Sequence, residues 1–208
     1  MLKSFRGGFT LAEVLITLGI IGVVAAMTMP TLLNSTNGAQ YRTAYKKALS
    51  VLSQAVVLNV ALDDYDLSQA TTTGTSSTEA SLYALFKNRM NVVKDNGTPN
   101  SSVDSWIAGN DNSAKFGDGG NYTMFFNDGI TFTFPNSAKE CKLGTANSIC
   151  KGVIDINGKK NPNKVVACDS TSGECKVTNP TDIYPVVMYD QSVLPNSKAA
   201  RAVLYGGK

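Results

Sequence analysis

The chain has 208 residues, of which 43% are hydrophobic and 17% are charged, and its formal net charge is +3. These values are typical of a folded domain with a membrane or secreted character, and they argue against a solvated, disordered chain. There is no histidine, the commonest general base and metal ligand, so no Ser-His-Asp or Cys-His catalytic arrangement can be built. The small, scattered positive charge indicates no specific nucleic-acid partner.

The N-terminal segment has the length and composition of a membrane span. Residues 14–33 carry no charge, and at about 1.5 Å per residue a helix of this length crosses about 30 Å of hydrocarbon. One acid, Glu13, stands at its front edge, where a carboxylate is costly unless it reaches the headgroups. A secretory signal peptide cut near Ala26, a plain anchor and a buried core helix are alternatives, but each leaves Glu13 without a role.

A cut between Gly8 and Phe9 would give Glu13 a partner. The new α-amine of Phe9 would have an ordinary pKa of about 7.7–8.0, so it would be positively charged over most of the physiological range. Glu13 follows four residues later, close enough to pair within one helix or across to a neighbouring subunit. Two charges that are costly alone in lipid would then become a pair on assembly.

The stretch GGFTLAEVLITLGIIGVVAAMTMPTLL resembles the processing and assembly segment of type IV prepilins and of the pseudopilins of type II secretion. The resemblance implies that a membrane prepilin peptidase cleaves after Gly8 and that the amine of Phe9 is then methylated. It also implies that Glu13 registers subunits in a helical filament, so that the protein is a substrate of these enzymes and not an enzyme. The positions that carry the resemblance are Gly8, Phe9, Thr10, Leu11, Glu13 and Pro30.

The same resemblance implies a division of the chain and a location. Residues 1–8 would be a leader peptide, 9–33 a transmembrane and filament-core helix, 34–62 an amphipathic helix continuing into the head, and 63–208 a globular head. The N-terminus would lie in the bacterial cytoplasm and the head in the periplasm, before the filament forms there or at the cell surface. The expected partners are copies of the chain, other pilins, the prepilin peptidase and methyltransferase, an inner-membrane assembly platform and the lipid bilayer. Basic residues flank the span on both sides, so the positive-inside rule does not settle the orientation.

Small residues and one proline interrupt the apolar span. Gly19, Gly22 and Ala26 fall near one helical face, which favours close helix packing in lipid, although local flexibility is an alternative explanation. Pro30 removes one helical hydrogen bond and is expected to kink or loosen the helix. A brief loosening is also expected at residues 34–38, NSTNG.

Beyond the span the sequence predicts an α+β head, in which the long helix packs on an antiparallel sheet. Apolar residues at three- and four-residue steps from Tyr41 to Val60 predict an amphipathic helix. Aromatic and β-branched runs around Asn127-Asp128-Gly129 predict a hairpin over residues 121–134. Pro185 places the last expected strand, 183–189, at a sheet edge. The other expected elements are a helix at 79–90, an irregular stretch to about Asn121, a strand at 151–158 and a stapled turn at 165–177.

Four cysteines, Cys141, Cys150, Cys168 and Cys175, lie in the C-terminal third. Four cysteines allow three pairings, but the two short spacings favour local bridges, Cys141–Cys150 and Cys168–Cys175. Each bridge would contribute roughly 2.5–3 kcal/mol on the chain-entropy account. A four-thiolate zinc site is the alternative, although its ligand pairs are normally two to four residues apart. Paired cysteines indicate an oxidising compartment.

One stretch of the head, DINGKKNPN, has the beginning of a calcium-loop pattern. Asp155, Asn157 and Gly158 are in the right order, but the further acidic positions are missing and lysines crowd the segment. A structural turn is therefore favoured, with calcium as a weak alternative and no other cofactor expected. The lysines at 151, 159, 160 and 164 are interpreted as a solvated face, the alternative being a basic patch for DNA or a surface.

Three functions are compatible with these observations. The first is a structural subunit of a type IV pilus-like filament, and the second is a pseudopilin that acts as a short piston in type II protein secretion. The disulfide-stapled head favours the first, because an exposed filament benefits from covalent ties. The third is a secreted binding protein with an ordinary signal peptide, whose mature chain would begin near Met27.

Overall fold

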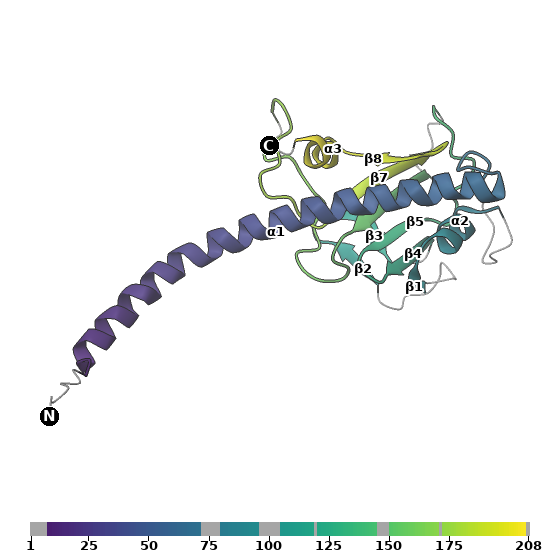
Figure 1. The fold of residues 1–208 in the computed structure, drawn as a ribbon. Coiled ribbons are helices and arrows are strands. Elements are labelled where there is room, and N and C mark those ends of the chain that lie inside the picture. The colour runs from purple at the N-terminus through teal and green to yellow at the C-terminus, as the bar shows by residue number, and fades with distance from the viewer. Residues whose placement is uncertain are drawn as a thin grey trace.

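A computed structural model describes residues 8–71, 80–95, 105–118, 120–144, 150–170 and 172–206. One long helix, α1 (Leu11–Asp63), projects from a head that contains an antiparallel sheet (Figure 1). The N-terminal part of α1 stands clear of the head and its C-terminal part packs across it. This is the α+β architecture that the sequence predicts.

Helix α1 is a single helix of 53 residues. It begins after Thr10 and ends before Asp64, whose left-handed φ of 58° terminates the helical backbone. Residues 34–38 are helical, so the brief loosening expected there is absent. The helix also continues through Pro30, and Figure 1 shows a gradual curve over its N-terminal part.

Within the described residues, six strands form one sheet in the order β1-β4-β5-β6-β7-β8, and every neighbouring pair is antiparallel. The predicted hairpin is present as β4 and β5, with Met124 opposite Phe132. The predicted strand at 151–158 is present as the shorter β6. The strands of this sheet are β1 (Val92–Asp95), β4 (Asn121–Phe126), β5 (Thr131–Pro135), β6 (Lys151–Asp155), β7 (Ile183–Tyr189) and β8 (Ser192–Pro195).

The prediction that strand 183–189 is a final edge strand is wrong. This strand is β7, which lies between β6 and β8, and the helix α3 (Lys198–Tyr205) follows β8. Asn196 N donates to Pro185 O at 2.9 Å, and the reciprocal bond is the one that proline cannot make. Because β8 ends at Pro195, this loss falls at the end of the ladder, where an internal strand tolerates it.

The stretch expected to be irregular up to about Asn121 contains three short strands. One is β1, and the other two, β2 (Trp106–Ala108) and β3 (Asp111–Phe116), form a separate antiparallel pair. Trp106 stacks on Phe116 with ring centroids 4.7 Å apart, and both pack against Ile183 of the main sheet. The β2–β3 pair is thus a small second layer with its own apolar cluster.

The main core lies between α1 and the sheet. The predicted stripe on α1 is buried at Tyr45, Ala48, Leu49, Leu52 and Val56, as expected from its spacing. Tyr45 stacks on Tyr184 of β7, with ring centroids 3.9 Å apart. The short helix α2 (Leu82–Arg89), predicted at 79–90, adds Phe86, whose ring meets Phe132 edge-on at 5.2 Å.

Both predicted disulfides are present. Cys141 is bonded to Cys150 and Cys168 to Cys175, so the local pairing is confirmed and the four-thiolate zinc alternative is excluded. Cys141 and Cys150 are buried in the main core, whereas Cys168 and Cys175 lie at its margin. The second bridge closes the turn that the sequence places at 165–177.

Candidate functional site

The N-terminal tip of α1 is fixed by a reciprocal pair of side-chain bonds. Thr10 Oγ1 accepts a hydrogen bond from Glu13 N at 3.3 Å, and Glu13 Oε2 accepts bonds from Thr10 N and Thr10 Oγ1, both at 2.8 Å. This capping box satisfies backbone donors that a helix start otherwise leaves unpaired. The order Thr-x-x-Glu before an apolar run is a sequence signal for this structure.

Gly8 and Phe9 lie just before this cap, and both are exposed. Phe9 has 89% of its surface accessible and precedes the first helical residue by two positions. The peptide bond between Gly8 and Phe9 is therefore outside the helix. Among the described residues, no group donates a hydrogen bond to Glu13 Oε1, so this oxygen is available to a second donor.

The part of α1 that projects from the head, called here the free part, has apolar side chains on all sides. Its segment Leu11–Pro30 has a mean hydropathy of 2.2 and none of it is buried inside the chain. By length and composition this segment could cross a membrane, and among the described residues it is the one such helix. A contiguous apolar surface of this size is unfavourable in water.

The polar and small residues of this segment are compatible with lipid or other helices around it. Thr17 Oγ1 donates to Glu13 O at 2.9 Å, and Thr28 Oγ1 donates to Val24 O at 3.0 Å, so both hydroxyls are satisfied by the helix itself. A Cβ added at Gly19 or Gly22 would meet no atom within 4 Å. These glycines are therefore not required by contacts within the chain, and a shallow apolar hollow lies beside Gly19.

The second predicted site lies at the base of the head, where α1 enters it. Asp155 is fully buried at the end of β6, where its Oδ2 accepts a bond from Trp106 Nε1 at 3.0 Å and its Oδ1 accepts one from Asn157 N at 3.1 Å. Burial raises the pKa of Asp155 to about 7, and the nearby carboxylate of Asp182 acts in the same direction. Helical rise separates this base from Glu13 by about 42 Å along α1, counted to Tyr41, so the structure does not bring the two predicted sites together.

Asp182 is a partner of this loop that sequence reasoning did not identify. It is fully buried and accepts bonds from Asn163 N at 2.8 Å and Lys164 N at 2.9 Å. A lone aspartate before a strand carries no distinctive pattern, so no sequence signal could have found it. Both carboxylates hold the backbone of the loop, as expected of a structural turn. Within the described residues, no three acidic, cysteine or histidine side chains are grouped to hold a metal ion.

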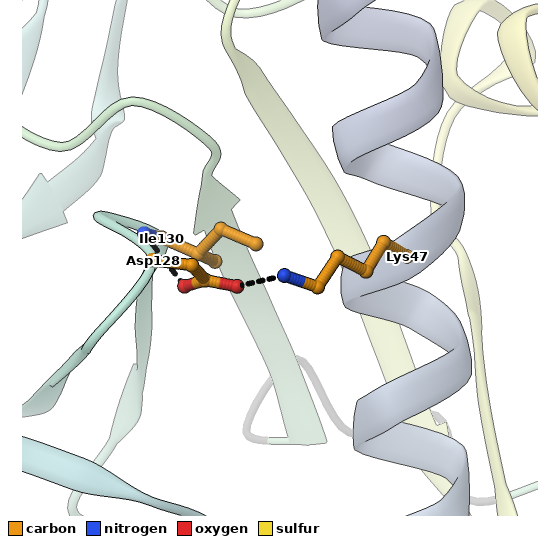
Figure 2. Close-up of polar contacts among 3 residues, drawn as sticks. All are labelled: Lys47, Asp128 and Ile130. Carbon is orange, nitrogen blue, oxygen red and sulfur yellow. Dashed lines mark hydrogen bonds and ion pairs between the residues drawn. The ribbon is translucent and has the colours of Figure 1, made fainter.

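An apolar pocket of about 170 Å³ lies beside the β4–β5 turn. Two of its lining residues form an ion pair, in which Lys47 Nζ lies 2.7 Å from Asp128 Oδ2, and Asp128 Oδ1 accepts a bond from Ile130 N at 3.2 Å (Figure 2). The ion pair ties the hairpin turn to α1.

Comparison with known proteins locates one feature. Residues 3–29 match the family described as the prokaryotic N-terminal methylation motif, which covers Gly8, Phe9 and Glu13 and stops short of the head. No curated protein and no solved structure matches the chain. From Leu11 onward the matched segment coincides with the exposed, apolar part of α1, and it also includes Gly8, Phe9 and the cap residue Thr10.

Proposed function

Because its N-terminal methylation motif places the chain in the type IV pilin and pseudopilin superfamily, we propose that it is a prepilin that polymerises into a pilus-like filament. Members of this superfamily are typically structural subunits and not enzymes. The observation that carries the proposal is the fully exposed apolar helix Leu11–Pro30, joined without a break to a head that has its own buried core. Such a helix has no partner within the chain, and a bilayer and then a bundle of identical helices would supply one.

Processing would begin at the exposed bond between Gly8 and Phe9. Cleavage after Gly8 by a prepilin peptidase would release residues 1–8, and methylation of the Phe9 amine would follow. The exposure of both residues outside the helix supports this step, because a peptidase needs an extended, accessible bond. The apolar part of α1 would then hold the protein in the inner membrane, with the head in the periplasm.

Assembly would use the carboxylate of Glu13. In a single chain Glu13 Oε2 completes the cap with Thr10, which leaves Oε1 without a donor from the described residues. The ammonium group of Phe9 in a neighbouring subunit would fill this position, so that the cap and the intermolecular pair exist together. The pairing would favour a register in which each helix tip meets the next.

Intact-mass measurement and N-terminal sequencing of the mature protein test this function. The expected mature chain begins at methylated Phe9. A mature chain that begins near Met27 would show an ordinary secretory signal and would contradict the proposal. Electron microscopy of cells with and without the gene then distinguishes long surface filaments from the short pseudopilus of a type II secretion system. We expect long filaments, because the disulfide bonds of the head would benefit an exposed filament.

A further inference from the structure

The base of the head lies close to the membrane surface if α1 is anchored as proposed. Gly38 is the first buried residue of α1 among those whose burial is described, and a Cβ at Gly38 would lie 3.2 Å from Pro180 Cδ. It follows the end of the apolar segment, Pro30, by eight residues, or about 12 Å of helix. Headgroups occupy about 5–8 Å on each side of a bilayer, so the base lies within a Debye length, about 8–10 Å, of the headgroup surface.

Two loops lie on either side of α1 at this base (Figure 1). The loop 156–164 is placed by a contact between Tyr41 and Asn157. The loop 168–180 borders a pocket of about 390 Å³ that Arg42 and the end of α3 also line. Both loops therefore lie at the end of the head from which the apolar part of α1 emerges (Figure 1).

The three segments 38–46, 156–164 and 168–180 are rich in cations. Their six basic residues, called here the basic collar, are Arg42, Lys46, Lys159, Lys160, Lys164 and Lys176. None of the six forms a salt bridge with a described residue. The exposed acids in the same segments are Asp169 and Glu174, and Asp169 already accepts two bonds from Thr178. Lys151 does not belong to the collar, because it begins β6 and the collar lysines follow the other end of that strand.

The far end of the head has the opposite character. Backbone bonds bring the segment after α1 together with the segments around Glu140 and Asp190. The acids gathered there outnumber the bases Arg89, Lys139 and Lys142, and Arg89 already pairs with Asp63. These acids are Asp63, Asp64, Asp66, Glu140 and Asp190. The head is thus polarised along α1, with its basic end toward the apolar span and its acidic end away from it.

We propose that the basic collar docks the base of the head on anionic phospholipid headgroups of the leaflet that α1 leaves. This inference rests on the proposed function, because it needs α1 to be anchored in a bilayer. Juxtamembrane groups of four to eight basic residues bind anionic lipid surfaces, and the collar falls in this range. Docking would hold the unassembled subunit upright on the membrane, and entry into a filament would release it.

Lysine footprinting of the full chain tests the proposal. The protein is reconstituted into vesicles of phosphatidylcholine alone or mixed with phosphatidylglycerol, and is labelled briefly with an acetylating reagent before peptide mass spectrometry. We expect anionic lipid to lower labelling of Lys159, Lys160 and Lys164 several-fold, and high salt to restore it. Lys139 and Lys142 at the far end are internal controls whose labelling should not change.

A matched pair of variants tests the contribution of the collar as a whole. Lys46→Gln/Lys176→Gln removes two collar charges outside the loop 156–164. We expect this variant to weaken the lipid-dependent protection of Lys159, Lys160 and Lys164 from labelling. Lys139→Gln/Lys142→Gln removes two charges at the far end and should leave the protection intact. Equal labelling in both lipid mixtures, or an equal fall at Lys139 and Lys142, would overturn the proposal.

Two further outcomes separate this inference from its rivals. One is that short duplex DNA protects Lys159, Lys160 and Lys164 in neutral vesicles while phosphatidylglycerol does not. That result would show that the loop 156–164 binds nucleic acid, and it would overturn lipid docking. A chain that fails to float with neutral vesicles would instead contradict membrane anchoring, and with it the proposed function. A chain that inserts normally but shows no lipid-dependent change in labelling would contradict only the docking of the basic collar.

Discussion

At the scale of single residues, Glu13 combines two properties that substitutions can separate. Its carboxylate closes the capping box with Thr10, and its charge is the group proposed to meet a neighbouring amine. The capping box lies in the sequence as Thr-x-x-Glu, whereas the free second oxygen emerges only from the geometry. A glutamine at position 13 would keep the cap acceptor and lose the charge.

We expect Glu13→Gln to be processed normally and to give few or no filaments. Thr10→Val weakens the cap but keeps the charge, so it should still assemble. Sheared surface fractions and whole-cell fractions, compared by immunoblotting, measure assembly and processing together. Abundant filaments from Glu13→Gln together with none from Thr10→Val would mean that the cap, and not the charge, is what assembly requires.

Asp155 is a residue whose ionisation opposes folding. Burial raises its pKa from 3.8 to about 7, so the native state retains a proton that the unfolded chain has released. Its contribution to the free energy of unfolding is therefore complete below about pH 4 and falls as the pH rises through about 7. A pKa shift of this size corresponds to roughly a few kcal/mol in the free energy of unfolding. Burial and the carboxylate of Asp182 raise the pKa, and the hydrogen bonds from Asn157 and Trp106 lower it.

We predict that the wild-type protein in detergent loses thermal stability between about pH 4 and 7 relative to Asp155→Asn. Asparagine resembles the protonated acid in shape and cannot ionise, so the variant lacks this part of the pH dependence. The difference between the two melting temperatures, followed by circular dichroism across this range, isolates the group from other titrations. A constant difference would show that Asp155 is ionised in the native state throughout.

At the scale of elements, α1 has one face in the core and another in solvent along the head. Leu52 faces the sheet with 2% of its surface exposed, whereas Leu58 is 49% exposed on the same helix. The stripe was readable from its three- and four-residue spacing, because a helix that packs on one side repeats that spacing.

Leu52→Ala should lower the free energy of unfolding by about 2–5 kcal/mol, because it removes buried methyl groups and leaves a cavity. Leu58→Ala should change it by about 0.5 kcal/mol or less, as is usual at surface positions. Urea titration of both variants in the same detergent makes the comparison. Similar losses for the two would mean that the exposed face of α1 is covered in solution.

Strand order was the least predictable property of the head. Pro185 indicated an edge, yet β7 is internal, because the missing donor coincides with the end of β8 at Pro195. That coincidence depends on which strand pairs with β7, and no local pattern encodes it. The strands β1, β2 and β3 were missed because β2 has only three residues and β1 and β3 carry charged residues. Trp106 and Phe116 show their role only when they stack.

At the scale of the whole molecule, the two halves of α1 have different surroundings. The segment Leu11–Pro30 is exposed and apolar, and the part from Tyr45 onward completes the core of the head. Composition and the charge-free run predicted the first half, and spacing predicted the second. The basic and acidic ends of the head could not be predicted, because they are formed by loops that are distant in the sequence.

We predict that residues 37–208, exported to an oxidising compartment, fold as a soluble domain. Deletion of the preceding part of α1 removes the segment Leu11–Pro30, none of which is buried inside the chain. The truncated protein should be monomeric by size exclusion, melt cooperatively and contain both disulfides by mass spectrometry. Aggregation or a broad transition would indicate that the free part of α1 stabilises the head.

The unbroken backbone of α1 also has a mechanical consequence. Its 53 residues form a strut about 80 Å long that reaches from the tip at Thr10 to the far end of the head without a hinge. Axial force applied at the tip would travel along one ladder of hydrogen bonds and displace the head by the same distance. Both disulfides are outside α1, so tension would load the hydrogen bonds of the helix before it loads the rest of the head.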